Sequence, residues 1–233
     1  MAVVLSGSFQ YRSSTGCEMM IPGSLLLGNS GDCFCCRHEH GTGDRCISFA
    51  FTPEFLDRVA EVVGYGRPYF RVSRIPPIRP AAPLVARASA FLAGDRSMSG
   101  EELSVQVAAQ SAGIVRGGDP GKANANASAL SRMTRVIRMI DNDSHVPQDL
   151  TSLAQIAGLS PYHFLRTFEE ITGTTPHQYV LRTRLRRAAI RLKTESAKIL
   201  DIALDCGFGD VSNFNRAFRA EFGMPPRRYR STA

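Results

Sequence analysis

The sequence predicts an α+β protein in which a small β-rich N-terminal domain with helices precedes an all-α C-terminal domain. Residues 1–52 contain β-prone segments that are separated by Gly, Ser and Asn. From residue 128 onward, apolar residues recur at helical spacing almost to the end of the chain. Between these parts, residues 117–127 have neither periodicity nor bulk. We therefore expect an interdomain linker there, with the two domains at 1–116 and 128–233.

The N-terminal domain is predicted to be β-rich over residues 1–52 and helical over residues 53–116. The β-prone segments, which should form a small antiparallel sheet, are 8–12, 24–28 and 46–51. A helix should follow, because Thr52 is a suitable N-cap, Pro53 suits the first turn and Gly64 can end it. The apolar residues at helical spacing in it are Phe55, Leu56, Val59 and Val62.

The proline-rich segment 75–80 cannot hold a helix and should be extended. Two further helices are expected at about 81–93 and 99–115. The first of them is a candidate self-association surface, so a homodimer is an open alternative.

The C-terminal domain is predicted to contain a long helix over residues 175–194, preceded by a helix whose apolar stripe ends at 141–143. One face of the long helix is rich in arginine: Arg182, Arg184, Arg186, Arg187 and Arg191. The chain has a net charge of +7 and a pI of about 9.4. Residues 128–233 carry +6 of this charge and residues 1–127 only +1. This distribution indicates that the C-terminal domain has a polyanionic partner.

A repeat lies on both sides of the long helix. The stretch GLSPYHFLRTF at 158–168 returns as GFGDVSNFNRAF at 207–218. From Phe164 onward, six identical residues recur at an offset of 50 within sixteen positions. The matched positions are Phe164 and Phe214, Arg166 and Arg216, Phe168 and Phe218, Gly173 and Gly223, Pro176 and Pro226, and Tyr179 and Tyr229. One structural unit used twice explains this better than composition does.

Each copy has the pattern of a helix-turn-helix unit: a short helix, a glycine turn, a polar N-cap and a second helix. Ser160 and Asp210 are the expected N-caps. The phenylalanines are spaced i, i+4 and should face the core, so the residues between them should face outward. In the first copy these are Tyr162, His163, Leu165, Arg166 and Glu169, and in the second Val211, Ser212, Asn215, Arg216 and Arg219.

These outward positions carry side chains that suit DNA. An α-helix fits the major groove, where arginine can address guanine and asparagine can address adenine. Arg166 and Arg216 are the best candidates for base contacts, with phosphate contact as the alternative. The arginine face of the long helix and the tail residues Arg227, Arg228 and Arg230 are expected to add nonspecific backbone affinity. The structural alternative is two amphipathic helix pairs whose arginines are merely solvated.

The C-terminal part, about 45% of the chain, resembles the DNA-binding domain of AraC/XylS-type transcriptional regulators. The similarity is carried by Ile202-Ala203-x3-Gly207-Phe208-x5-Phe214-x-Arg216-x-Phe218-x4-Gly223-x-Pro225-Pro226-x2-Tyr229-Arg230. This resemblance implies a cytoplasmic bacterial regulator that binds double-stranded DNA with two recognition helices in successive major-groove faces, about 34 Å apart. It also implies activation through contact with RNA polymerase, although the residues leave repression open.

A cluster of cysteine and histidine lies in the N-terminal domain, where five of the six cysteines fall between Cys17 and Cys46. If 33–40 is a strand, Cys36, His38 and His40 share one face. With Cys46 they would make a tetrahedral site for zinc or another transition metal, with Cys33 as a competing ligand. The spacing matches no zinc-finger pattern. Thiol redox sensing and an organic small-molecule effector are the alternatives.

The stretch Gly31-x6-His38-x-His40 is similar to the first cupin motif, with one extra residue before the first histidine. In AraC-type regulators the effector domain often resembles a cupin barrel, so a partial cupin-like fold is expected here. The region before the linker is shorter than usual in that family, which argues for an incomplete barrel. The competing function is a cupin-like metalloprotein or redox sensor whose helical domain is structural.

The sequence argues against several other classes. No apolar run is long enough for a membrane span, and the N-terminus lacks the pattern of a secretory signal, so we expect a cytoplasmic protein. No phosphate-binding glycine loop and no Ser-His-Asp arrangement with recognisable context is present. Glu39, the nearest acid or base, points to the strand face opposite the histidines. We therefore do not expect an enzyme.

Overall fold

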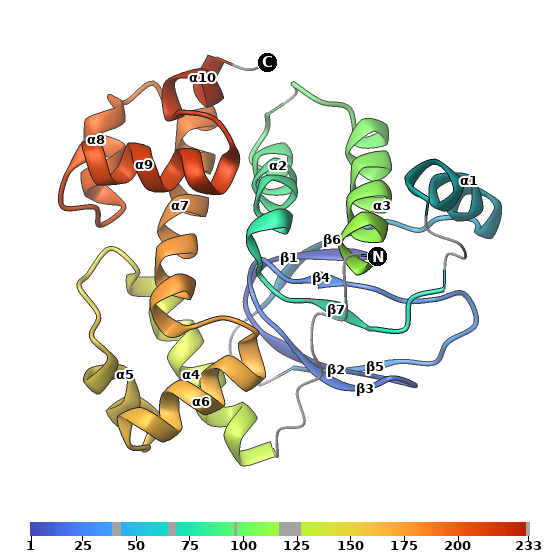
Figure 1. The fold of residues 1–233 in the computed structure, drawn as a ribbon, viewed down its shortest axis with the longest axis horizontal. Helices are drawn as coiled ribbons and strands as arrows, with labels where there is room; N and C mark the ends of the chain where they lie inside the picture. Colours follow the sequence, from blue (N-terminus) through green and yellow to red (C-terminus); the bar gives the residue numbers. More distant parts are fainter. Residues whose placement is uncertain (39–42, 65–68, 96, 117–126, 232–233) are drawn as a thin grey trace.

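The computed structural model describes residues 1–38, 43–64, 69–95, 97–116 and 127–231 (Figure 1). A β-rich N-terminal domain with helices lies beside a helical C-terminal domain, which confirms the predicted fold class. Almost all of the expected linker lies outside the described residues.

Within the described residues, seven strands form two antiparallel sheets. The strands are β1 (Ala2–Ser6), β2 (Phe9–Ser13), β3 (Gly16–Met20), β4 (Leu25–Leu26), β5 (Cys35–His38), β6 (Arg45–Ser48) and β7 (Arg74–Ile75). One sheet has the order β6-β1-β4-β7 and the other β3-β2-β5. The three predicted β segments contain β2, β4 and the end of β6, whereas β1, β3 and β7 were not predicted individually.

Side-chain alternation along β1 gives the N-terminal domain two small cores. Val3 packs against the helices above the first sheet, and the next residue, Val4, points between the two sheets. The inner core contains Val4, Phe9, Tyr11 and Met20. The two sheets therefore face each other as an open sandwich.

Three helices accompany the sheets: α1 (Pro53–Val63), α2 (Ala82–Leu92) and α3 (Gly100–Arg116), with a short 3-10 turn, η1 (Arg79–Ala81), before α2. The predicted caps of α1 are confirmed, because Thr52 accepts a hydrogen bond from the Phe55 backbone N–H and Gly64 is left-handed. The prediction that α2 offers a self-association surface is wrong. It packs against the long helix of the C-terminal domain, α3 and β1, and its alanines are buried.

The C-terminal domain consists of α4 (Ala127–Asp143), α5 (Leu150–Ala157), α6 (Pro161–Thr172), α7 (Pro176–Thr194), α8 (Ile199–Asp205), α9 (Val211–Phe222) and α10 (Pro226–Ser231). One core gathers α4, α5, α6 and the start of α7, and a second gathers the rest of α7 with α8, α9 and α10. Because both cores use α7, this helix joins the two units (Figure 1).

The N-terminal domain contributes side chains to both of these cores. Met19 and Ile21 belong to the first, and Ala82 and Ala86 of α2 belong to the second. In the second core, alanines of α2 and α7 lie at the contact, and small side chains allow two helices to approach closely. Both helical units thus pack against the N-terminal domain.

Candidate functional site

The two helix-turn-helix units are built by local signals in the sequence. In the first, Gly158 is left-handed at the end of α5, and the Ser160 hydroxyl accepts a hydrogen bond from the His163 backbone N–H. In the second, the Asp210 carboxylate accepts from the Asn213 N–H at 2.7 Å. Gly207 has a φ of +89°, and an added Cβ would lie 2.6 Å from the His145 carbonyl oxygen. Only glycine fits this turn.

The identities in the repeat are mainly core residues. Phe164 and Phe168 of α6 and Phe214 and Phe218 of α9 are fully buried. Phe168 packs edge-on against Tyr179, and Phe218 packs in the same way against Tyr229. Each unit thus uses the same aromatic cluster to fix its second helix, which confirms that the inner faces of α6 and α9 are equivalent.

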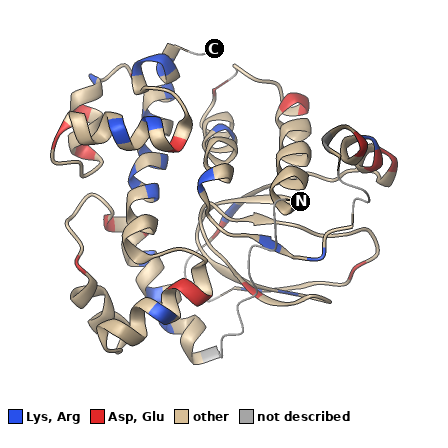
Figure 2. Cartoon of the chain, viewed as in Figure 1, with Lys and Arg blue, Asp and Glu red and all other residues tan. Residues whose placement is uncertain are grey.

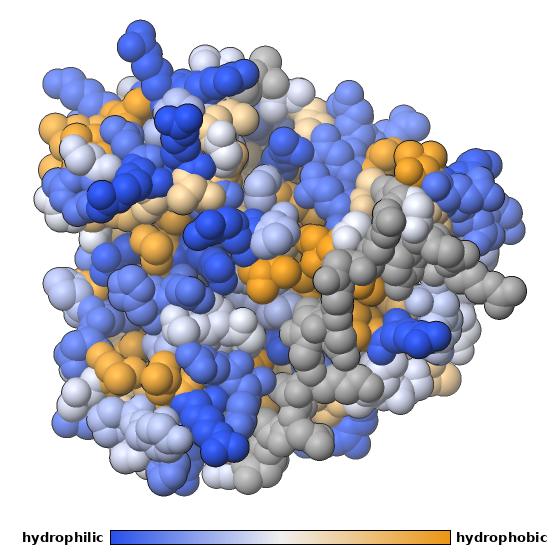
Figure 3. All heavy atoms as spheres, viewed as in Figure 1, coloured by the Kyte–Doolittle hydropathy of each residue, from blue (hydrophilic) through white to orange (hydrophobic). Residues whose placement is uncertain are grey.

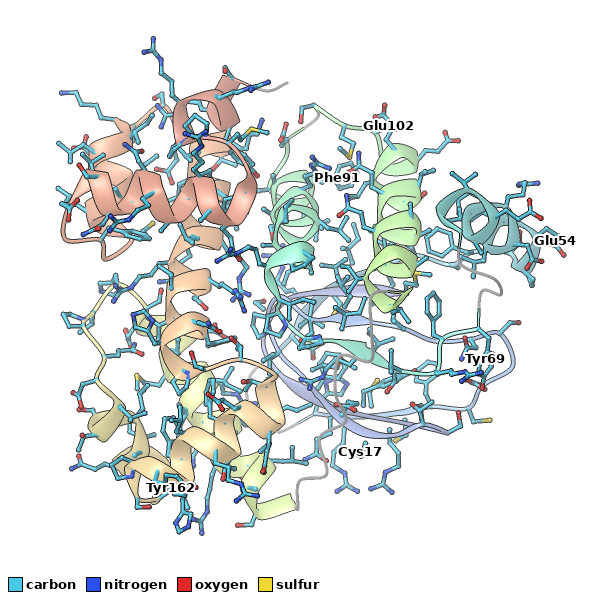
Figure 4. The ribbon with its side chains drawn as sticks, viewed as in Figure 1. Cys17, Glu54, Tyr69, Phe91, Glu102 and Tyr162 are labelled. Carbon is cyan, nitrogen blue, oxygen red and sulfur yellow. The ribbon has the colours of Figure 1, made fainter. Side chains whose placement is uncertain are left out.

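The opposite faces of α6 and α9 are exposed, as predicted. Tyr162, whose side chain is 71% exposed, extends from α6 in Figure 4. Seven further predicted positions are exposed: His163, Arg166, Glu169, Ser212, Asn215, Arg216 and Arg219. Leu165 and Val211 differ, because both are half-buried, and Leu165 lines a groove of about 710 Å³ between α5 and the start of α7. Polar side chains cover much of this domain in Figure 3, with small apolar patches between them.

Each of the two candidate arginines contacts another side chain of its own helix. Arg166 Nε lies 3.0 Å from Glu170 Oε1, and this contact raises the pKa of the guanidinium. Arg216 donates to the Asn213 side chain, which in turn donates to Asp210 at 2.6 Å. These contacts orient each arginine and must be exchanged when it meets a DNA group. Asn213 was missed from the sequence, although its i, i+3 spacing to both Asp210 and Arg216 is a usable signal.

The arginine face of α7 makes many contacts within the protein. Arg184 donates to the backbone carbonyls of Ser144 and Gly207, at 2.5 and 2.8 Å. Further arginines of this face are engaged by protein groups: Arg182 by Pro77 and Glu221, Arg186 by Pro22, Arg187 by Ser144, and Arg191 by Glu195 and Asp205. These cations stabilise the packing of the protein, and a contribution of this face to DNA-backbone affinity stays a prediction. Arg216 and Arg219 of α9 and Arg227 and Arg228 of α10 remain exposed, on helices marked blue in Figure 2. The tail residue Arg230 is half-buried and donates to the Ala197 carbonyl at 2.7 Å.

A buried carboxyl group joins α4 to α7. Asp141 accepts a hydrogen bond from the Tyr179 hydroxyl at 3.0 Å. Burial raises the pKa of Asp141 to about 6, against the opposing effects of Arg186 and Arg187 and of its hydrogen bonds. The folded protein therefore binds this proton more tightly than the unfolded chain does.

The unfolding free energy should consequently depend on pH through Asp141. The contribution of this group is most favourable below its ordinary pKa of 3.8 and is lost as pH rises to about 6. Asp141→Asn keeps an acceptor for Tyr179 but has no titrating proton. We expect urea unfolding of this variant to show a flatter pH dependence between about pH 4 and pH 6 than the parent chain. Parallel curves would contradict the raised pKa.

The structure brings some of the predicted metal ligands together. Cys36, His38 and Cys46 line one cavity, although the two cysteines belong to different sheets. His38 Nδ1 lies 2.8 Å from the Asp44 carboxylate, which the sequence did not single out. Cys33 is exposed, and His40 lies outside the described residues. Among the residues that are described, no group of three or more His, Cys, Asp or Glu side chains is placed to hold a metal ion.

The thiols in this cavity have raised pKa values. Burial, followed by Asp44, raises the pKa of Cys46 to about 12, and burial, Cys35 and Asp44 raise that of Cys36. The reactive form of cysteine is the thiolate, for metals as well as for oxidants. Protonated thiols therefore argue against redox sensing at Cys36 and Cys46.

The same cavity has a volume of about 950 Å³ and lies between the two sheets and α1. This size is typical of sites for small organic molecules.

None of the helices within the described ranges is both long and apolar enough to cross a membrane.

Comparisons with known proteins match the C-terminal domain. A family model described as "Helix-turn-helix domain" matches residues 153–232. The regulatory protein SoxS of Salmonella typhimurium is 35% identical over 95 residues, which cover 41% of this chain and 89% of SoxS. The transcriptional activator RhaS of Mannheimia succiniciproducens is 35% identical over 96 residues, which cover 41% of this chain and 36% of RhaS.

A solved structure of an AraC-type regulator from Chromobacterium violaceum is 30% identical, with a TM-score of 0.43, and the match covers 46% of this chain and 95% of that one. The chain thus spans little more than a third of RhaS but most of SoxS.

Two helix-turn-helix units on one long helix, each with a buried aromatic face and an exposed polar face, define a transcriptional regulator that binds DNA. The family model spans residues 153–232, which include most of both units. The chain belongs to the AraC/XylS family of transcriptional regulators.

Proposed function

We propose that the protein binds specific DNA sites by inserting α6 and α9 into successive major-groove faces on one side of the duplex, about 34 Å apart. The observation that carries this proposal is that α6 and α9 bury equivalent aromatic faces and leave Arg166 and Arg216 exposed at equivalent positions. The internal bracing of α7 supports it further, since a helix tied by its own arginines can hold two recognition helices at a fixed spacing.

The exposed residues of the two helices would make different kinds of contact with DNA. Arg166 and Arg216 would read bases, with Asn215 beside Arg216 as a partner for adenine. Tyr162, His163, Ser212 and Arg219 would contact bases or phosphates at the edges of each site. The half-buried Leu165 and Val211 would offer apolar contact, for example to a thymine methyl group.

The base-reading role of the two arginines is testable. Arg166→Ala and Arg216→Ala should each cost about 1–3 kcal/mol of binding free energy at the preferred site and relax the preference for one base pair. Arg227→Ala, on the exposed tail, is the control and should weaken binding about equally for all sequences. The measurement is fluorescence anisotropy at one fixed salt concentration. Unchanged affinity in both recognition-helix variants would show that the assigned positions are wrong.

The binding site itself can be found by selecting DNA from a random pool with the full chain at physiological salt. A directional motif of two boxes, about one helical turn apart, is the expected result. If no sequence is enriched, the proposal is wrong. If the enriched motif has a single box, only one of the two units reads bases.

The N-terminal domain would regulate this activity. We propose that the cavity between its sheets holds a small-molecule effector, that the protein has no enzymatic role, and that it acts in the bacterial cytoplasm. Activation through RNA polymerase is the favoured output, since RhaS is named an activator. Promoter transcription in a purified system, with and without the chain, tests this output, and reduced transcription would indicate a repressor instead.

A further inference from the structure

The walls of the cavity between the sheets combine aromatic rings with negative charge. Six aromatic residues line it: Phe9, Tyr11, Phe34, Phe49, Phe51 and Tyr69. The side chains of Phe34 and Tyr69 are largely exposed, and both residues lie at the cavity (Tyr69 is labelled in Figure 4). Aromatic faces attract cations as well as apolar groups, because the ring quadrupole is negative above the plane.

Three carboxylates, those of Asp32, Asp44 and Asp57, also line the cavity. Within the described residues, its lining includes no lysine and no arginine. The Met1 ammonium also lines it; it donates to the Phe49 carbonyl at 2.9 Å, and burial lowers its pKa. The His38 imidazole there lies 2.8 Å from the Asp44 carboxylate.

Two of the carboxylates keep their charge uncompensated. Asp32 accepts a hydrogen bond from the neutral Asn29 amide at 3.0 Å. In the described part of the chain, neither Asp32 nor Asp57 forms an ion pair with a basic residue. In this chain of net charge +7, the part of the cavity wall that the structure describes is therefore locally negative.

Neighbouring acidic groups in the cavity respond to this field. The pKa of Tyr11 is raised by burial, then by Cys36 and Asp32. Asp44 contributes in the same direction to the raised pKa values of Cys36 and Cys46. Burial, the largest cause in each case, opposes a charge of either sign, so only the contributions of Asp32 and Asp44 indicate local negative charge.

We propose that this cavity binds an organic cation, an ammonium group attached to an apolar body, with its charge near Asp32 and Asp57 and its body against the aromatic rings. The inference rests on the proposed function, since this cation would be the effector of the regulator. The volume of about 950 Å³ accommodates a molecule of this kind.

The position of the cavity links it to the DNA-binding domain. Pro53, Leu56 and Asp57 of α1 form part of its wall. Helix α1 packs on α3, α3 on α2, and α2 on α7, so the four helices form a row across the molecule (Figure 1). A ligand that contacts α1 therefore acts at one end of this row, and the helix that joins the two recognition units stands at the other.

The test uses the full chain and three probes that share a phenyl group and similar size. These are benzyltrimethylammonium, which is a permanent cation, the anion phenylpropanoate and the neutral ketone benzylacetone. Isothermal titration calorimetry should show binding of the cation, and the anion should bind at least about tenfold more weakly. Tighter or equal binding of the anion or the ketone would overturn the assigned ligand class, and binding of none of the three would overturn the assignment of the cavity as a cation site.

Matched variants locate the binding. Asp32→Asn with Asp57→Asn keeps the shape of both side chains and should weaken binding of the cation about tenfold. Asp201→Asn, which changes an exposed aspartate on α8, is the control and should leave it unchanged. Tyr69→Leu removes an exposed ring at the cavity and supplies a second variant that spares the core. Unaltered binding in both cavity variants would overturn the proposed location.

The DNA selection experiment does not include these probes. A chain that selects a two-box motif but binds no cation would refute this inference and leave the DNA-binding function intact. A chain that binds the cation but selects no DNA would refute the proposed DNA-binding function and leave the cation site supported.

Discussion

Replacing Glu18 with glutamine should lower the free energy of unfolding by about 3–5 kcal/mol. The Arg74 side chain is only 2% exposed, and its Nε lies 3.2 Å from Glu18 Oε2. Burial lowers the pKa of Arg74, and the carboxylate of Glu18 opposes that shift. Without the carboxylate, a buried cation loses its compensating charge, which costs far more than an exposed ion pair contributes.

A second variant separates this charge effect from simple loss of packing. Glu18→Gln combined with Arg74→Met removes both charges, so it should be less destabilised than Glu18→Gln alone. Urea unfolding followed by circular dichroism measures both variants. If the free energy of unfolding of Glu18→Gln lies within about 1 kcal/mol of that of the parent chain, the Glu18–Arg74 ion pair contributes less to stability than predicted.

Phe214→Ala should destabilise the second helix-turn-helix unit by about 3–5 kcal/mol. The Phe214 ring is fully buried, and its centroid lies 5.0 Å from that of Phe208 and 5.4 Å from that of Phe218. Its removal leaves a cavity beneath the recognition helix α9. Because the first unit has a separate core, site selection with this variant should lose one of the two boxes and retain the other.

The matched control is Phe34→Ala, since Phe34 is 66% exposed. This change removes the same atoms without opening a buried cavity, and it should cost less than about 1 kcal/mol. Equal losses in the two variants, measured by thermal unfolding, would show that the repeated phenylalanines are not the core of their unit.

Local signals explain which features could be predicted from the sequence. Ser160, Asp210 and Gly158 act on their own turns, so the caps and the helix-turn-helix boundaries follow from neighbouring residues. The same holds for α1 between Thr52 and Gly64. The repeat added a test of consistency, because two copies with the same inner residues must bury the same face.

Contacts between distant residues explain what could not be predicted. The periodicity of α7 shows that one face is polar, but it does not show that Arg182 and Arg186 meet Pro77 and Pro22 of the other domain. Strands β1 and β7 gain their order from pairing with β4, and β7 has only two residues. In the cavity, Asp44 and Asp57 come together with the aromatic rings only after the sheets and α1 have packed.

Met19, Ile21, Ala82 and Ala86 have a consequence for modularity. These side chains fill gaps in the two helical cores from outside the C-terminal domain. SoxS aligns with this domain over 89% of its own length, so in that relative a comparable pair of units makes up nearly the whole protein. Here the two helical cores also bury side chains of the neighbouring domain, so a substitution at one of these four positions changes the packing of both halves of the chain.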